Sequence, residues 1–209
     1  MEKTKKILKW IGKGVAGALA VFGVFLVILI IVRMFHFYNL DKTNAEVAKI
    51  HATKLTLDDV MGKNLPPDPG ANADTTIAGV DANNNGIRDD VELAIFKAYP
   101  NLAKTRAVLL QYALTLQLEM TLPILNTDTA TAVIADNNFR AHTCISNISS
   151  RSNPEKYFAE IDKNTKFVEN LQLNNEQRKN YLDNDVYNYV RSYSASNGGC
   201  DLDLSTLPN

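Results

Sequence analysis

The sequence predicts an all-α protein, with a single transmembrane helix near the N-terminus followed by a small helical bundle. Three observations lead to this prediction. From Val15 to Val32 every residue is apolar or glycine. After residue 89, apolar side chains recur at helical spacing in segments separated by prolines and asparagines. Alternating runs of β-branched and polar residues, which indicate strands, are nearly absent.

The apolar run is long enough to cross a bilayer, because about 20 residues of helix span a hydrocarbon core of roughly 30 Å. Lysines crowd its N-terminal side and Arg33 is the only charge close to its other end, so the positive-inside rule places the N-terminus in the cytoplasm. We expect a basic cytoplasmic tail at residues 1–9 and an uncleaved signal anchor at residues 10–38. A cleaved signal peptide is the alternative, since Ala18-Leu19-Ala20 resembles a cleavage site, but cleavage there would leave a long apolar tail.

Residues 39–80 predict a juxtamembrane segment and a proline-rich linker. The first part forms either a solvated stalk or a helix whose apolar stripe is Leu40, Val47, Ile50, Leu57 and Val60. The stretch Leu65-Pro66-Pro67-Asp68-Pro69-Gly70 disfavours regular structure. We therefore expect an extended segment from Gly62 to Val80.

Oxygen-bearing side chains recur at alternate positions immediately after this segment. Calcium takes six to eight oxygen ligands, which a loop can supply from alternate residues. The predicted ligands are the side chains of Asp81, Asn83, Asn85, Asp89 and Glu92 and the main-chain carbonyl of Ile87. Gly86 permits the sharp turn. The alternative is an Asn/Asp/Gly turn that binds nothing, but a plain turn needs neither Asp89 nor Glu92.

This segment resembles the EF-hand loop, and from Asp81 to Asp89 it is similar to the aspartate-rich repeats of thrombospondin type 3 modules. The resemblance covers a dozen residues and implies bound Ca²⁺. It departs from a paired EF-hand at Arg88, which stands where an apolar residue is usual, and in the proline-rich segment, which offers no entering helix. Together with the Leu-Pro-Pro-Asp-Pro-Gly stretch and the following helix, the loop resembles uncharacterised exported bacterial proteins, which implies an extracytoplasmic domain at residues 81–209.

The rest of the chain predicts five helices, each delimited by capping residues or prolines. We expect them from Asp89 to Pro100; from Leu102 to Leu122, largely buried; from a cap at Thr127 or Asp128 to Ile148; from Pro154 to Leu171; and from a cap at Asn174 or Asn175 through Val190 and Tyr193 to Asn197-Gly198-Gly199.

Cys144 and Cys200 are the only cysteines. In an oxidising compartment two cysteines most simply form a disulfide, and the alternative is two free thiols. His142 lies two residues before Cys144, which hints at a Cys/His nucleophile, but residues two apart on a helix point to different faces. The three scattered histidines form no zinc pattern.

Charge and motif content narrow the function classes. From residue 39 onward 16 basic residues face 22 acidic ones, so we expect no nucleic-acid partner. We find no catalytic constellation, and we therefore expect a non-enzymatic protein of the bacterial inner membrane. Its calcium-binding domain would be periplasmic and would have a structural or interaction role, with a protein partner in the envelope.

Two other functions remain open from the sequence. Asp183 and Asp185 stand among tyrosines between residues 181 and 193, which suits an envelope hydrolase or a carbohydrate-binding protein. Glycines at positions 14, 17 and 23 permit close helix contact, which suits an accessory subunit of a membrane complex.

Overall fold

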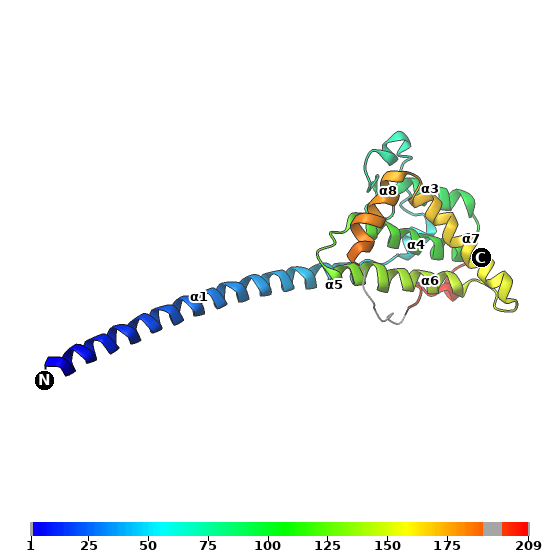
Figure 1. Ribbon diagram of the computed structural model, residues 1–209. Coiled ribbons are helices and arrows are strands. Elements are labelled where there is room, and N and C mark those ends of the chain that lie inside the picture. Colours follow the sequence, from blue (N-terminus) through cyan, green and yellow to red (C-terminus); the bar gives the residue numbers. More distant parts are fainter. Residues whose placement is uncertain (1, 190–197, 209) are drawn as a thin grey trace. The chain divides into compact units, whose positions relative to one another are not determined.

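The computed structural model describes residues 2–189 and 198–208, and this part of the chain contains helices and turns but no strand, as predicted. The chain divides into two compact units, Met1–Ala45 and Glu46–Asn209. The α-helices, labelled where space allows in Figure 1, are α1 Glu2–Ala52, α2 Leu57–Met61, α3 Asp89–Ala98, α4 Ala103–Thr121, α5 Thr127–Ala130, α6 Asn138–Asn147, α7 Pro154–Gln172 and α8 Glu176–Tyr181. The 3-10 helices are η1 Gly70–Asp74, η4 Tyr187–Tyr189 and η5 Leu204–Thr206, and two π-helices are η2 Thr131–Asn137 and η3 Leu182–Val186.

The first helix, α1, is long and apolar enough to cross a membrane, by its length and composition. Its apolar side chains are exposed throughout the run that the sequence singles out. The helix does not end with that run but continues to Ala52, so the helical alternative is confirmed for residues 39–52. The predicted stripe then breaks, and Leu57 and Val60 lie on the separate helix α2.

Local capping interactions fix both ends of helix α2. The hydroxyl of Thr56 accepts the N–H of Asp59, and the Asp59 carboxylate accepts the N–H of Thr56 at 2.8 Å. Gly62 ends the helix in a left-handed conformation with φ 68°, which glycine adopts without strain. The expectation of a wholly extended segment beyond this point is wrong, because η1 forms a short helical turn after Pro69.

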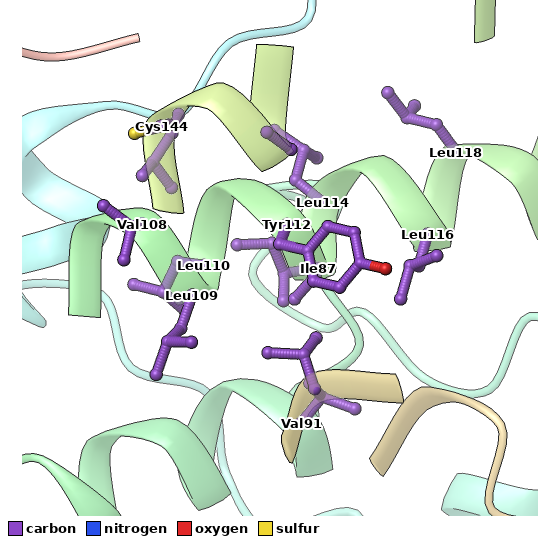
Figure 2. Packing of buried hydrophobic residues seen from close by; sticks show 14 of the residues in the cluster. Ile87, Val91, Val108, Leu109, Leu110, Tyr112, Leu114, Leu116, Leu118 and Cys144 are labelled. Carbon is purple, nitrogen blue, oxygen red and sulfur yellow. The ribbon is translucent and has the colours of Figure 1, made fainter. Parts of the chain in front are cut away.

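Helix α4 is the centre of the second unit. Sixteen of its nineteen residues are buried, and α3, α6, α7 and η2 all pack against it. Figure 2 shows its leucines and Tyr112 together with Ile87 and Val91. The dense apolar pattern from Leu102 to Leu122 thus marks a helix surrounded on all sides.

The segment from Thr127 to Asn147 is helical throughout, as predicted, but not uniformly α-helical. Asn126 is its N-cap and accepts the N–H groups of Asp128 and Thr129, so the predicted caps, Thr127 and Asp128, are wrong. The π-helix η2 separates α5 from α6. A π-turn widens the helix and shifts the side chains that follow it.

The last helices begin where the sequence predicts. Asn153 caps α7, with Pro154 in its first turn, and Asn175 caps α8. Helix α8 passes directly into the π-helix η3 and the 3-10 helix η4. The predicted continuation through Val190, Tyr193 and Asn197 lies outside the described residues.

Candidate metal centre

The loop after Val80 folds around the carboxylate of its first residue. Asp81 accepts the N–H of Asn85 at 3.1 Å and the N–H of Gly86 at 2.9 Å. The side-chain oxygen of Asn85 accepts the N–H of Ile87 at 2.9 Å. Asn84 and Gly86 are left-handed, with φ 56° and 83°. The alternate oxygen-bearing residues therefore brace the turn that the sequence predicts at Gly86.

Packing against α4 explains why this turn needs glycine. A Cβ on Gly86 would stand 2.8 Å from Cδ1 of Leu114. The next side chain, Ile87, is fully buried in the core near Leu114 and Val91 (Figure 2). The loop is thus fastened to the most buried helix of the unit through an apolar anchor.

The two acidic residues at the end of the loop are buried in the first turn of α3. The carboxylate of Asp89 accepts the N–H of Ala82 at 3.0 and 3.1 Å, and that of Glu92 accepts Nδ2 of Asn83 at 3.1 Å. Their exposed fractions are 0% and 1%. The positive end of the helix favours negative charge at these positions.

Burial dominates the electrostatics of both carboxyl groups. Loss of hydration raises the pKa of Glu92 to about 7, against the opposing effect of the hydrogen bond from Asn83. Burial also raises the pKa of Asp89, while the N–H of Ala82 lowers it and the charge of Asp81 raises it further. Within residues 2–189 and 198–208, no Lys, Arg or His nitrogen forms an ion pair with these three carboxylates. An ionised carboxylate that is buried without a neighbouring cation is costly. The ionised form of this loop therefore lacks the positive charge that would offset this cost.

The donor set suits a hard cation. The loop offers carboxylate and amide oxygens, which are the ligands that Ca²⁺ prefers. In the part of the chain that the structure describes, no three His, Cys, Asp or Glu side chains are already gathered as a metal cluster. Several of the oxygens instead accept main-chain N–H groups or the Asn83 amide. The amide oxygen of Asn83 accepts the N–H of Asn85 within the loop, while its Nδ2 faces Glu92, so a bound metal ion would have to displace that amide nitrogen from the carboxylate.

One contact of the loop has no signal in the sequence. Nδ2 of Asn83 donates both to Glu92 and to the main-chain carbonyl of Asn64, at 2.8 Å. Asn64 lies 19 residues earlier in the chain, directly before the proline-rich stretch. The amide nitrogen, with its partial positive charge, thus joins the linker to the end of the loop.

Arg88, the residue that departs from the EF-hand pattern, has a structural role. Its side chain is fully buried and pairs with Asp90 through Nε at 2.6 Å and through a terminal nitrogen at 2.9 Å. It also donates to the main-chain carbonyls of Leu171 and Gln172 at the C-terminus of α7. Where a paired EF-hand has an apolar contact with a sister loop, this loop therefore binds the end of a helix.

A second buried arginine fixes the segment before the loop. Arg178 of α8 donates to the main-chain carbonyls of Ala73, Thr76 and Ile77 and to the carboxylate of Asp74. The loop is thereby held on both sides by the corner between α7 and α8. Sequence reasoning missed this role, because nothing near Arg178 in the chain distinguishes it from a surface arginine.

The two cysteines form a disulfide, as predicted. Cys144 on α6 and Cys200 are joined by an S–S bond of 2.05 Å, which removes a catalytic thiol from consideration. The next residue, Asp201, has a buried carboxylate that accepts the N–H of Leu55 at 2.9 Å and pairs with Arg140. The C-terminal tail is thus attached both to α6 and to the segment that follows α1.

The carboxylates of the tyrosine-rich segment are not gathered into a site. Asp183 and Asp185 lie on η3 and are exposed, while Val186, the last residue of η3, faces the core. Tyr193, which the sequence places in the same region, lies outside the described residues.

Comparison of this chain with protein-family models, with curated proteins and with solved structures finds no match. The function of the chain must therefore be inferred from the geometry of the loop and of the helices around it.

Proposed function

We propose that this chain is a single-pass membrane protein whose extracytoplasmic helical domain binds Ca²⁺ through the loop from Asp81 to Glu92. One observation carries the proposal. Asp89 and Glu92 are buried without a cationic partner in the described chain, in a loop whose first carboxylate is Asp81. A divalent cation would neutralise these charges and replace the hydration that the carboxylates have lost.

Calcium in this loop would act as a structural staple. The loop already contacts the linker through Asn64, the core through Ile87 and the end of α7 through Arg88. An ion that orders the loop would strengthen all three connections together. A calcium sensor would instead need a helix pair that opens, and the segment before this loop is not a helix that could enter such a pair. We expect a modest affinity, about 10⁻⁴ to 10⁻³ M, as in extracellular modules.

Two features support a location in the bacterial envelope. Lysines precede the apolar part of α1, which favours a cytoplasmic N-terminus and a periplasmic domain on the other side of the inner membrane. The disulfide favours an oxidising compartment. We propose a structural or interaction role there, with a protein partner rather than a nucleic acid and without enzymatic activity. The exposed Asp183 and Asp185 give the hydrolase and carbohydrate alternative no support.

Thermal unfolding of the full chain in detergent micelles tests this proposal. Calcium at about 100 times its dissociation constant should stabilise the domain by about 2.7 kcal/mol relative to a chelator, or by roughly 5–10 °C for a domain of this size. Asp81→Ala and Glu92→Ala should abolish that increment. The control Asp162→Ala removes an exposed carboxylate of α7 and should retain it.

Two outcomes would contradict the proposal. Calcium could leave the melting temperature of the wild-type chain unchanged, or the loop variants could lose equal stability with calcium and with chelator. A titration with Mg²⁺ in parallel separates calcium binding from a general effect of divalent ions, because Mg²⁺ demands a smaller and more regular site.

A further inference from the structure

Another buried carboxylate lies in the same unit and outside the calcium loop. Glu119 of α4 is fully buried. Its oxygen Oε1 accepts Nδ2 of Asn138 at 3.2 Å, and Oε2 accepts the hydroxyl of Tyr187 at 3.3 Å. Both donors are neutral groups, and within the described residues no Lys, Arg or His nitrogen forms an ion pair with this carboxylate.

Both donors follow directly after a π-helix. The π-helix η2 ends at Asn137, one residue before Asn138, and η3 ends at Val186, one residue before Tyr187. A π-turn inserts an extra residue and rotates the side chains that follow it, and such turns are frequent at functional sites. Two separate departures from α-helical geometry thus end at side chains that bind the same carboxylate.

Among the residues that the structure describes, the charged groups acting on this site are negative. Glu169 of α7 accepts the hydroxyl of Tyr112 at 2.7 Å and repels a charge on Glu119. The ring of His142 on α6 packs at a tilt against Tyr112, with ring centres 4.9 Å apart, and burial lowers its pKa, which favours the neutral imidazole at physiological pH. Burial raises the pKa of Tyr187, and the negative charges of Asp183 on η3 and of Glu169 raise it further.

We propose that Glu119 is a proton-binding switch, which holds η4 against α4 when it is protonated and releases η4 when it ionises. The inference is independent of the calcium loop, since none of its residues belongs to that loop. Its ligand is the proton, and the element it controls is the helical turn that follows η3.

The surroundings of Glu119 decide which element would move. Ionisation of a fully buried carboxylate requires access of water. Helix α4 is buried along nearly its whole length, and α6 is attached to the C-terminal tail by the disulfide. By contrast η4 has three residues, all exposed, with Tyr187 at 39%. Outward movement of η4 is therefore the least costly route for water.

The protonation equilibrium of Glu119 is suited to a response near neutral pH. Burial raises the pKa of Glu119 to about 7, against the opposing hydrogen bonds from Asn138 and Tyr187. Changes in external pH around neutrality would therefore change the protonation of Glu119.

Hydrogen exchange of the full chain in lipid nanodiscs tests the switch. Peptides that cover residues 182–189 are compared with peptides that cover α7, at about pH 6 and about pH 8.5, after correction for the intrinsic exchange rate. In the wild-type chain the protection of residues 182–189 should fall about tenfold more than that of α7 at the higher pH. In Glu119→Gln, which stays neutral, the two peptides should respond alike.

Two further variants identify the group that carries the pH response. His142→Gln removes the nearby imidazole and should retain the wild-type pH response. Tyr187→Phe removes one donor without changing charge and should loosen residues 182–189 at the lower pH as well. The proposal is overturned by a wild-type chain that shows no pH response in this segment, or by a response that persists in Glu119→Gln.

Discussion

Replacement of Arg178 by methionine should produce the largest loss of stability of any single substitution outside the hydrophobic core. Methionine has a similar length and apolar stem, so packing is largely retained while the donors are removed. The guanidinium is fully buried. Its acceptors are the side chains of Asp74 and Asn174 and the main-chain carbonyls of Ala73 at 2.6 Å, Ile77 at 2.9 Å and Thr76 at 3.1 Å.

The magnitude follows from which acceptors can find water. Asp74 and Thr76 are exposed and can be hydrated after the substitution, whereas Ala73 is buried and Ile77 is half-buried. Each carbonyl left unsatisfied costs about 1–3 kcal/mol, so Arg178→Met should lower the free energy of unfolding by about 4 kcal/mol, within the range for a broken buried pair. For a unit of this size that corresponds to a fall in melting temperature of roughly 8–16 °C.

Thermal and urea unfolding of the full chain in micelles, followed by circular dichroism, measures this loss. Lys179→Met is the matched control, because Lys179 lies on the same helix, has a side chain 48% exposed and, within the described residues, pairs only with exposed Glu176. We expect less than about 0.5 kcal/mol for the control. A loss for Arg178→Met within about 1 kcal/mol of the control would refute the reasoning, because it would mean that the segment from Ala73 to Ile77 contributes little to folding.

The disulfide, Gly79 and Glu119 each give a further prediction. Replacement of Cys144 and Cys200 by alanine opens a link across 56 residues and should cost about 4 kcal/mol, measured by urea unfolding with and without a reductant. Gly79→Ala should cost about 2–4 kcal/mol, because Gly79 has φ 69° and an added Cβ would collide with the buried side chain of Arg88. Gly199→Ala is the control, because the space around Gly199 is open. Glu119 binds its proton more tightly when folded, so its contribution is fully present below the unfolded pKa of about 4.5 and is lost as pH rises through about 7. The wild-type chain should therefore lose about 3 kcal/mol relative to Glu119→Gln over that interval, and parallel stability curves for the two chains would contradict this.

The elements that the sequence predicts well are those with local determinants. The starts of α7 and α8 follow from the caps Asn153 and Asn175, and the glycine at position 86 indicates the turn of the loop. These features depend on residues within a few positions of one another, where capping and turn geometry dominate. The error at Asn126 has the same origin, because three adjacent residues there can all cap a helix.

The sequence by itself determined the all-α class, the apolar helix, the spacing of the loop and the pairing of the two cysteines, because each is expressed in composition or in short-range pattern. Only the tertiary structure decided that Arg88 and Arg178 are buried and hold the loop to the corner of α7 and α8, and that Glu119 meets Tyr187 across 68 residues of chain. Charged side chains give no sign in a sequence of whether they face water. Whether an arginine or a glutamate is buried depends on the partners that distant segments bring to it, and those partners exist only after the chain has folded.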